Sequence, residues 1–108
     1  MKVEIASLDF NKGDGLIPVI VQDEKTREVL TLAYCNREAL ERTIKTKKSW
    51  FWSRSRRKLW MKGEESGNIQ NITGILSDCD LDAIIYLVNP TGPACHTGRR
   101  LCFFNTIM

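Results

Sequence analysis

Three aspartates and a cysteine lie together in the C-terminal half of the chain, in a spacing suited to metal binding. The run is Asp78-Cys79-Asp80-Leu81-Asp82. Successive side chains of an extended segment point to opposite faces, so we expect the three carboxylates on one face and Cys79 on the other. Carboxylate oxygens in such a row suit Mg²⁺ or Ca²⁺. The alternative is a solvated acidic turn that holds no ion.

Three cysteines form a second group of potential metal ligands, separated by 15 and 6 residues: Cys79, Cys95 and Cys102. None belongs to a CxxC pair, so the thiols could also be buried as small apolar groups. Three thiolates would leave a fourth position open, as in a catalytic zinc site. We therefore expect a hard and a soft metal site on opposite faces, and we hypothesise that a second subunit completes the soft one.

His96 is the only histidine of the chain and follows Cys95 within the Gly- and Pro-rich segment 92–98. Adjacent residues of an extended chain point apart, so both side chains could not easily hold one ion. We favour His96 as a general acid or base over His96 as a zinc ligand.

A basic and aromatic segment precedes the acidic run, with nine Lys or Arg and no acid from Arg42 to Lys62. Guanidinium groups suit phosphates, which favours Arg54 and Arg56 as phosphate ligands. Its three tryptophans could stack on a base, but three in one hairpin are more typical of a small core. The glycine-bounded loop 63–68 that follows can bring backbone amides close to a ligand.

The periodicity predicts one α+β domain over residues 1–108, with a strand-dominated mixed sheet or pseudobarrel and one main helix. The helix is expected over 37–47 after an N-cap at Asn36. Strands are expected over 16–22, 28–34, 50–55, 59–62, 69–77, 83–89 and 99–104. The longest apolar run, Ala83 to Val88, is too short to span a membrane, and no secretory leader is visible. We therefore expect a cytoplasmic protein with free or metal-bound thiols.

Three stretches together resemble the phosphoribosyl-AMP cyclohydrolase family of histidine biosynthesis: WSRSRRKLWMKGEESGN (52–68), DCDLD (78–82) and GPACHTGRRLCF (92–103). GLIPVIVQD and AYCNREAL are similar to the family's opening strands and helix. The resemblance implies a hydrolase that opens the adenine ring of phosphoribosyl-AMP at the N1–C6 bond, in which zinc-activated water attacks C6. It also implies an intertwined homodimer with active sites at the interface, and no nucleic-acid or membrane partner. Six residues follow Cys102, so we expect the pyrophosphohydrolase activity often fused to the family to come from another protein.

Residue roles follow from the same resemblance. It implies zinc held by Cys95, Cys102 and the partner subunit's Cys79, and proton transfer by His96. It implies Mg²⁺ at Asp78, Asp80 and Asp82. The substrate's phosphates and riboses would be held by residues of two segments: Arg54, Arg56, Glu64, Ser66 and Asn68. Cys35 lies outside these motifs, and we interpret it as a packing residue.

Two other functions compete with this interpretation. A zinc nucleobase deaminase also attacks a ring carbon, but its H-x-E and P-C-x-x-C signature is absent. A small zinc-stabilised nucleic-acid-binding module could use the basic segment, but it would not need the row of aspartates.

Overall fold

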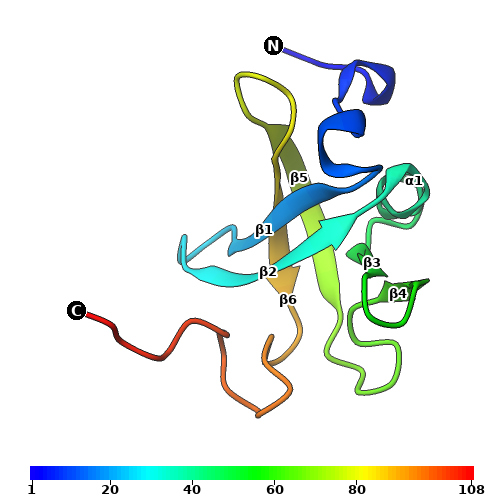
Figure 1. Ribbon diagram of the computed structural model, residues 1–108. Coiled ribbons are helices and arrows are strands. Elements are labelled where there is room, and N and C mark those ends of the chain that lie inside the picture. Colours follow the sequence, from blue (N-terminus) through cyan, green and yellow to red (C-terminus); the bar gives the residue numbers. More distant parts are fainter.

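A four-stranded mixed sheet forms the centre of the computed structural model, which describes residues 1–108 (Figure 1). The strand order is β2-β1-β6-β5. The antiparallel hairpins are β1 (Ile17–Asp23) with β2 (Val29–Cys35), and β5 (Gln70–Ser77) with β6 (Ile84–Pro90). The parallel pair β1–β6 joins the two hairpins.

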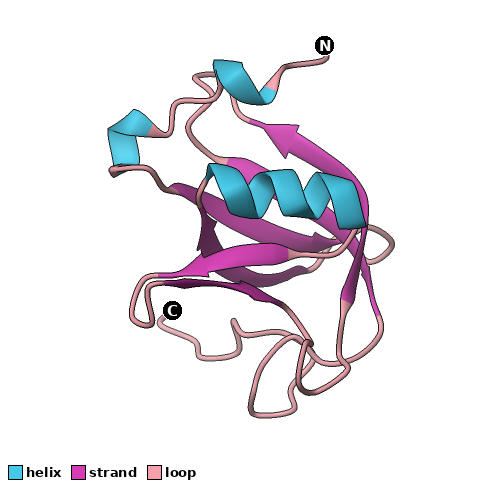
Figure 2. Ribbon diagram, turned by 90° about the vertical axis from the view of Figure 1, so that its right-hand side faces the viewer, coloured by secondary structure: helices cyan, strands magenta, loops and turns pink.

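The one α-helix, α1 (Arg37–Thr46), lies over the strands and contacts both β2 and β3 (Figure 2). A separate two-stranded sheet consists of β3 (Trp50–Ser53) and β4 (Lys58–Met61). Two short 3-10 helices, Ile5–Ser7 and Asn11–Gly13, precede β1. No helix has the length and apolar character needed to cross a membrane.

The expected α+β class, mixed sheet and single main helix are confirmed. The N-cap is also confirmed, because Asn36 Oδ1 accepts a hydrogen bond from the amide of Ala39 at 2.8 Å. The helix ends at Thr46, one residue early, because Lys47 adopts the left-handed conformation (φ 60°) that ends helices.

The core lies where the parallel strands meet α1 and β3. Phe51 is fully buried, with ring centroids 5.0 Å from Trp60 and 5.6 Å from Tyr86. Trp50 and Trp60 are half-buried and pack against the core, so the expectation of core tryptophans is confirmed for them only in part. The fully buried aromatic residue of the hairpin is Phe51. The Tyr86 hydroxyl, buried beneath the helix, donates to the carbonyl of Trp50 at 3.1 Å.

Cys35 is confirmed as a packing residue. Its side chain is fully buried at the end of β2. Burial raises the pKa of its thiol to about 12, so the group stays neutral and apolar.

The expected strand over 99–104 is wrong. The chain after β6 is irregular, and its backbone groups bond to one another within a single loop. The amides of Ala94 and Cys95 donate to the carbonyls of Arg100 and Arg99, respectively. One further bond, from the amide of Cys102 to the carbonyl of Leu30 at 2.7 Å, ties this segment to β2. A single such bond makes no ladder, so no strand forms.

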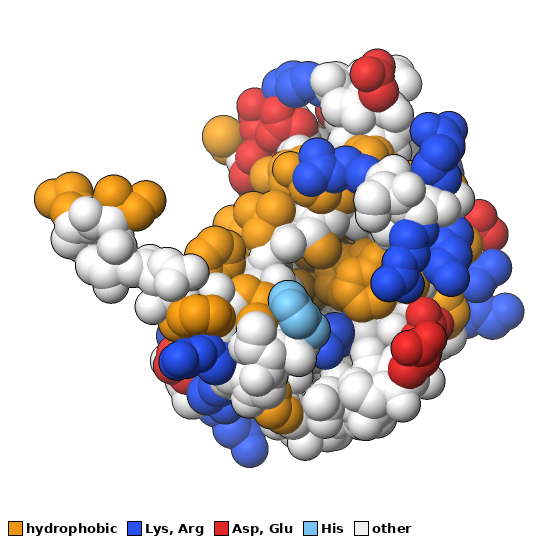
Figure 3. All heavy atoms as spheres, turned by 60° about the horizontal axis from the view of Figure 1, so that its bottom comes forward, with side chains coloured by type: hydrophobic (Ala, Val, Ile, Leu, Met, Phe, Trp, Pro, Cys, Tyr) orange, Lys and Arg blue, Asp and Glu red, His pale blue; other side chains and the backbone are white.

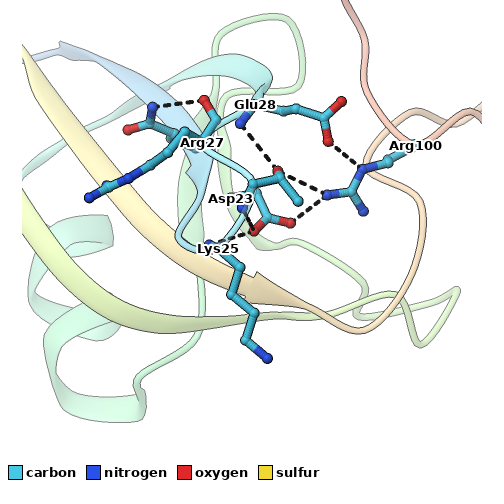
Figure 4. Close-up of polar contacts among 7 residues, drawn as sticks. Asp23, Lys25, Arg27, Glu28 and Arg100 are labelled. Carbon is cyan, nitrogen blue, oxygen red and sulfur yellow. Dashed lines mark hydrogen bonds and ion pairs between the residues drawn. The ribbon is translucent and has the colours of Figure 1, made fainter.

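Arg100 fastens this C-terminal loop to the β1–β2 turn (Figure 4). Its guanidinium donates to Asp23 Oδ2 at 2.6 Å, to Glu28 Oε1 at 2.7 Å and to Thr26 Oγ1 at 3.2 Å. Burial of the Asp23 carboxylate opposes ionisation, but the amides of Thr26 and Lys25 together with Arg100 outweigh burial and lower the pKa of Asp23. The cluster therefore holds a buried negative charge at the end of β1 that fixes the position of the loop.

Replacement of Asp23 by Asn should lower the free energy of unfolding by about 1–2 kcal/mol at pH 7, because Arg100 then loses its buried charged partner. The pKa of Asp23 is lower in the folded state than its ordinary value of 3.8. The ionised carboxylate therefore stabilises the fold above pH 3.8, and this stabilisation is lost as the pH falls through the folded-state pKa. The difference between wild type and Asp23→Asn should therefore narrow below pH 3.8. Urea unfolding over a pH series measures this difference in the free energy of unfolding. Glu24→Gln, at an exposed neighbouring residue, serves as the control. A difference that stays constant on acidification would contradict the charge-based account.

Candidate functional site

The acidic run Asp78–Asp82 forms the tight turn between β5 and β6, so the expected extended conformation is wrong. The amide of Asp78 donates to the carbonyl of Ala83 at 3.1 Å, and Leu81 has a left-handed φ of 63°. The turn nevertheless brings carboxylate oxygens of all three aspartates within 4.8 Å of one another. Their convergence is confirmed, although curling of the chain produces it and strand alternation does not.

Two kinds of donor already engage these carboxylates. Asp78 Oδ1 accepts from the amides of Asp82 and Ala83 at 3.0 and 3.2 Å, which stabilises the turn. Lys12 Nζ lies 2.6 Å from Asp82 Oδ2 and 3.4 Å from Asp80 Oδ2. The hydrogen bond with Asp82 raises the pKa of Lys12, and the same bond lowers the pKa of Asp82. Asp80 faces both other carboxylates, which raise its pKa. Converging oxygens in a partly exposed turn fit a hard divalent cation.

Sequence reasoning missed Lys12. The residue lies 66 positions before Asp78 and belongs to no motif, so the only signal was its positive charge. The pairing exists because the N-terminal segment returns to the turn, where the amide of Asp9 donates to the carbonyl of Leu81 at 2.8 Å.

Cys95 and Cys102 lie side by side in the C-terminal loop, with their side chains within hydrogen-bonding reach. The Thr97 hydroxyl donates to Cys95 Sγ at 3.1 Å, and with the Thr97 amide it lowers the pKa of Cys95. Burial and the adjacent Cys95 raise the pKa of Cys102. A pair of sulfur donors, one of which has a lowered pKa, fits a soft metal such as zinc.

Cys79 is not brought to this pair within one chain. It is exposed in the β5–β6 turn, at one end of β6, whereas the thiol pair follows the other end (Figure 1). A strand of seven residues such as β6 is roughly 20 Å long. The three predicted zinc ligands therefore divide into a pair and a distant single residue.

His96 is exposed beside the buried Cys95. On this face the histidine stands next to a hollow with a hydrophobic floor, and Lys and Arg side chains lie along its far rim (Figure 3). A cavity of about 390 Å³ also adjoins the loop, lined by Pro90, Thr91, Gly92, Pro93, Gly98 and Arg100. The histidine is thus open to a ligand.

The loop predicted to bind substrate contains Glu64, Ser66 and Asn68. It lies against the thiol loop, the segment after β6 that carries Cys95 and Cys102. Thr91 Oγ1 donates to the carbonyls of Gly67 and Ile69, at 3.2 and 3.1 Å. A Cβ atom added to Gly92 would lie 2.3 Å from Asn68 Oδ1, so the two loops touch closely. Ser66 Oγ accepts from the amide of Asn68 at 3.1 Å, while Glu64 is exposed.

The two predicted phosphate ligands belong to the turn between β3 and β4. The Arg54 guanidinium carbon lies 3.9 Å from the centre of the Tyr34 ring, which orients that side chain over β2. Arg56 is exposed, and only its backbone amide makes a bond, to Ser53 Oγ at 3.1 Å. Neither guanidinium is paired with a carboxylate, so both remain available to an anion.

A groove lies at the other end of the molecule, beside Cys79. Its volume is about 1120 Å³, and mostly apolar residues of α1, β5 and the N-terminal segment line it. Exposed apolar side chains on this face include Val3, Ile44 and Leu76. Ile44 is 45% exposed, whereas Leu40, one helical turn before it, is buried.

Comparison with known proteins gives a consistent result. The family model for phosphoribosyl-AMP cyclohydrolase matches residues 31–104. A phosphoribosyl-AMP cyclohydrolase from Nitrosopumilus maritimus is 68% identical over 107 residues, 99% of each chain. One from Cenarchaeum symbiosum is 64% identical over the full length of both chains. A histidine biosynthesis bifunctional protein from Bacillus subtilis is 62% identical over 96 residues, which cover 89% of this chain and 46% of that protein. The chain therefore belongs to the phosphoribosyl-AMP cyclohydrolase family.

Proposed function

We propose that this protein hydrolyses the N1–C6 bond of the adenine ring in phosphoribosyl-AMP, as a step of histidine biosynthesis. The observation that carries this proposal is similarity along the whole chain to proteins named for that activity. The site adds support, since a thiol pair, a histidine and a glycine-bounded loop share one face. We assign the protein to the cytoplasm, where its free thiols would stay reduced.

We assign zinc to Cys95, Cys102 and the partner subunit's Cys79 in a homodimer. Two thiols of one chain are too few for the three ligands and open position of a catalytic zinc site. Cys79 lies too far from the pair to serve the same ion in one chain. The mostly apolar groove beside Cys79 offers a surface for the second copy, which would bring its thiol pair to this cysteine.

We assign Mg²⁺ to Asp78, Asp80 and Asp82. Their oxygens converge within 4.8 Å, and hard divalent cations prefer carboxylates and water. An Mg²⁺ ion there would relieve the mutual repulsion of the three charges.

The chain's own residues would complete the reaction as follows. When bound, zinc supplies an activated water for attack on the electrophilic C6 of the ring. The His96 imidazole accepts a proton from the attacking water and returns one to N1 as the C6–N1 bond breaks, so that the proton balance closes. Arg54 and Arg56 bind phosphate oxygens through their guanidinium groups. The loop with Glu64, Ser66 and Asn68 positions the riboses beside the thiol pair.

The ring-opening assay on phosphoribosyl-AMP, in metal-replete buffer, tests this function. Cys95→Ser should lose zinc and nearly all activity, because one sulfur ligand is removed. His96→Ala should keep its zinc and lose about 10²–10⁴-fold in kcat, the usual contribution of a positioned acid or base. Thr91→Ser, which keeps the hydroxyl of a neighbouring loop residue, serves as control. Full activity in Cys95→Ser would exclude the zinc assignment, and loss of zinc from His96→Ala would make that residue a ligand.

Asp80→Asn separates the two metals. The variant should retain zinc, because the three thiols assigned to zinc, Cys79 included, are unchanged. Its activity should lose its dependence on added Mg²⁺. Metal content by atomic absorption and a magnesium titration of the rate measure the two effects. Unchanged magnesium dependence would exclude the acidic turn as the site.

Mixing two inactive variants tests the shared zinc site. In a heterodimer of Cys79→Ser and Cys95→Ser chains, one site carries both changes and the other carries neither. Random pairing should therefore restore about a quarter of wild-type activity. The readout is the rate after co-refolding, with each variant alone as control. No recovery despite dimer exchange, or an active monomer with tightly bound zinc, would contradict the shared site.

A further inference from the structure

We propose that Lys12 is a built-in competitor for the cation site of the acidic turn, whose ammonium a divalent ion must displace. This inference rests on the magnesium role proposed above for that turn. Lys12 Nζ contacts Asp82 Oδ2 at 2.6 Å and Asp80 Oδ2 at 3.4 Å. The ammonium thereby occupies two of the three carboxylates that converge on the site.

The backbone places Lys12 there. The amide of Asp9 donates to the carbonyl of Leu81 at 2.8 Å, which docks the N-terminal segment on the turn itself. The amide of Lys12 then donates to Asp9 Oδ1 at 3.1 Å, and the 3-10 helix Asn11–Gly13 fixes the direction of the chain. A lysine presented by two backbone anchors reaches the carboxylates with less loss of conformational freedom than one on a free tail.

Lys12 and a divalent ion need the same oxygen. The Asp82 side chain is 22% exposed, against 58% for Asp80. The ammonium therefore makes its shorter contact with the less exposed carboxylate. An ion bound to all three aspartates must take an Asp82 oxygen and would then lie a few ångströms from a like charge. The observed affinity is the intrinsic affinity multiplied by the fraction of molecules in which Lys12 has moved away.

Removal of the ammonium should therefore have two effects of opposite sign. Divalent binding should tighten by about three- to tenfold, a modest factor because exposed ion pairs are individually weak. The metal-free protein should lose thermal stability, because three carboxylates then face one another without a counter-charge. Removal of a lysine with only a structural role would also lower stability, but it would leave divalent binding unchanged or weaker.

Titration of the zinc-loaded protein with Mn²⁺, followed by the electron paramagnetic resonance signal of the free ion, measures the affinity independently of catalysis. The variants are Lys12→Met, Asp80→Asn to identify the signal of the turn, and Lys25→Met as the matched control. Lys25 is an exposed lysine of the β1–β2 turn, at the opposite end of the sheet. We expect tighter Mn²⁺ binding and a lower metal-free melting temperature in Lys12→Met, with both values unchanged in Lys25→Met.

Equal or weaker Mn²⁺ binding in Lys12→Met would overturn the competitor role and leave the proposed enzyme function intact. Wild-type protein without any Mn²⁺ binding that depends on Asp80 would overturn both the cation role of the turn and this inference. The ring-opening assay would still decide separately whether the protein is a cyclohydrolase. If Lys12→Met fails to fold, the same titration on Lys12→Gln, which keeps most of the side-chain length, decides the question.

Discussion

The pairing of β6 between β1 and β5 is the constraint on which the rest of this structure depends. β6 runs parallel to β1 and antiparallel to β5, and its buried residues Ile84, Tyr86 and Val88 lie in the core. The same strand begins at the acidic turn and ends at the loop that carries Cys95. Because strands are stiff and the core fixes their register, the two chemically distinct segments are held at opposite ends of the molecule.

At each end of the sheet, a basic residue from a terminal segment meets a group of carboxylates. Arg100 joins the C-terminal loop to Asp23 and Glu28, and Lys12 joins the N-terminal segment to Asp80 and Asp82. These partners are separated by 68 to 77 residues in the sequence. The carboxylate of Asp23 is buried, so the Arg100 pair fixes the thiol loop firmly, whereas the more exposed Lys12 pair can exchange. Burial thus distinguishes a structural clamp from a contact that solvent can reach.

Local patterns predicted most of the regular structure. Alternating and β-branched segments such as β1 are visible without tertiary information, and Asn36 marks the start of the helix because its cap bond is local. The failures have tertiary or turn-level causes. The Asp78–Asp82 segment contains a left-handed Leu81, a conformation that the residue type disfavours. The segment 99–104 has strand-like composition, but its backbone groups bond within its own loop and to Leu30. Phe51 is the buried aromatic residue of its hairpin, and the sequence pattern does not distinguish it from the larger tryptophans that flank it.

The candidate site was predictable in its residue types and less so in its arrangement. The convergence of the three aspartates was predicted from their spacing, but a turn produces it and not the strand alternation behind that prediction. The motif around Cys95 and Cys102 predicted the neighbouring thiols. The position of Cys79 relative to that pair depends on the length and direction of β6, and the contact of Lys12 depends on how the N-terminal segment folds back. Both require long-range geometry that spacing along a sequence does not encode.

The close contact of Gly92 with Asn68 limits which residues these two positions can hold. Any side chain at position 92 would meet the Asn68 amide, at 2.3 Å for a Cβ atom alone. A larger residue at 92 is therefore acceptable only with a smaller or reoriented residue at 68. The residue at position 92 therefore constrains the side chain at position 68, although the two segments are separate in the sequence.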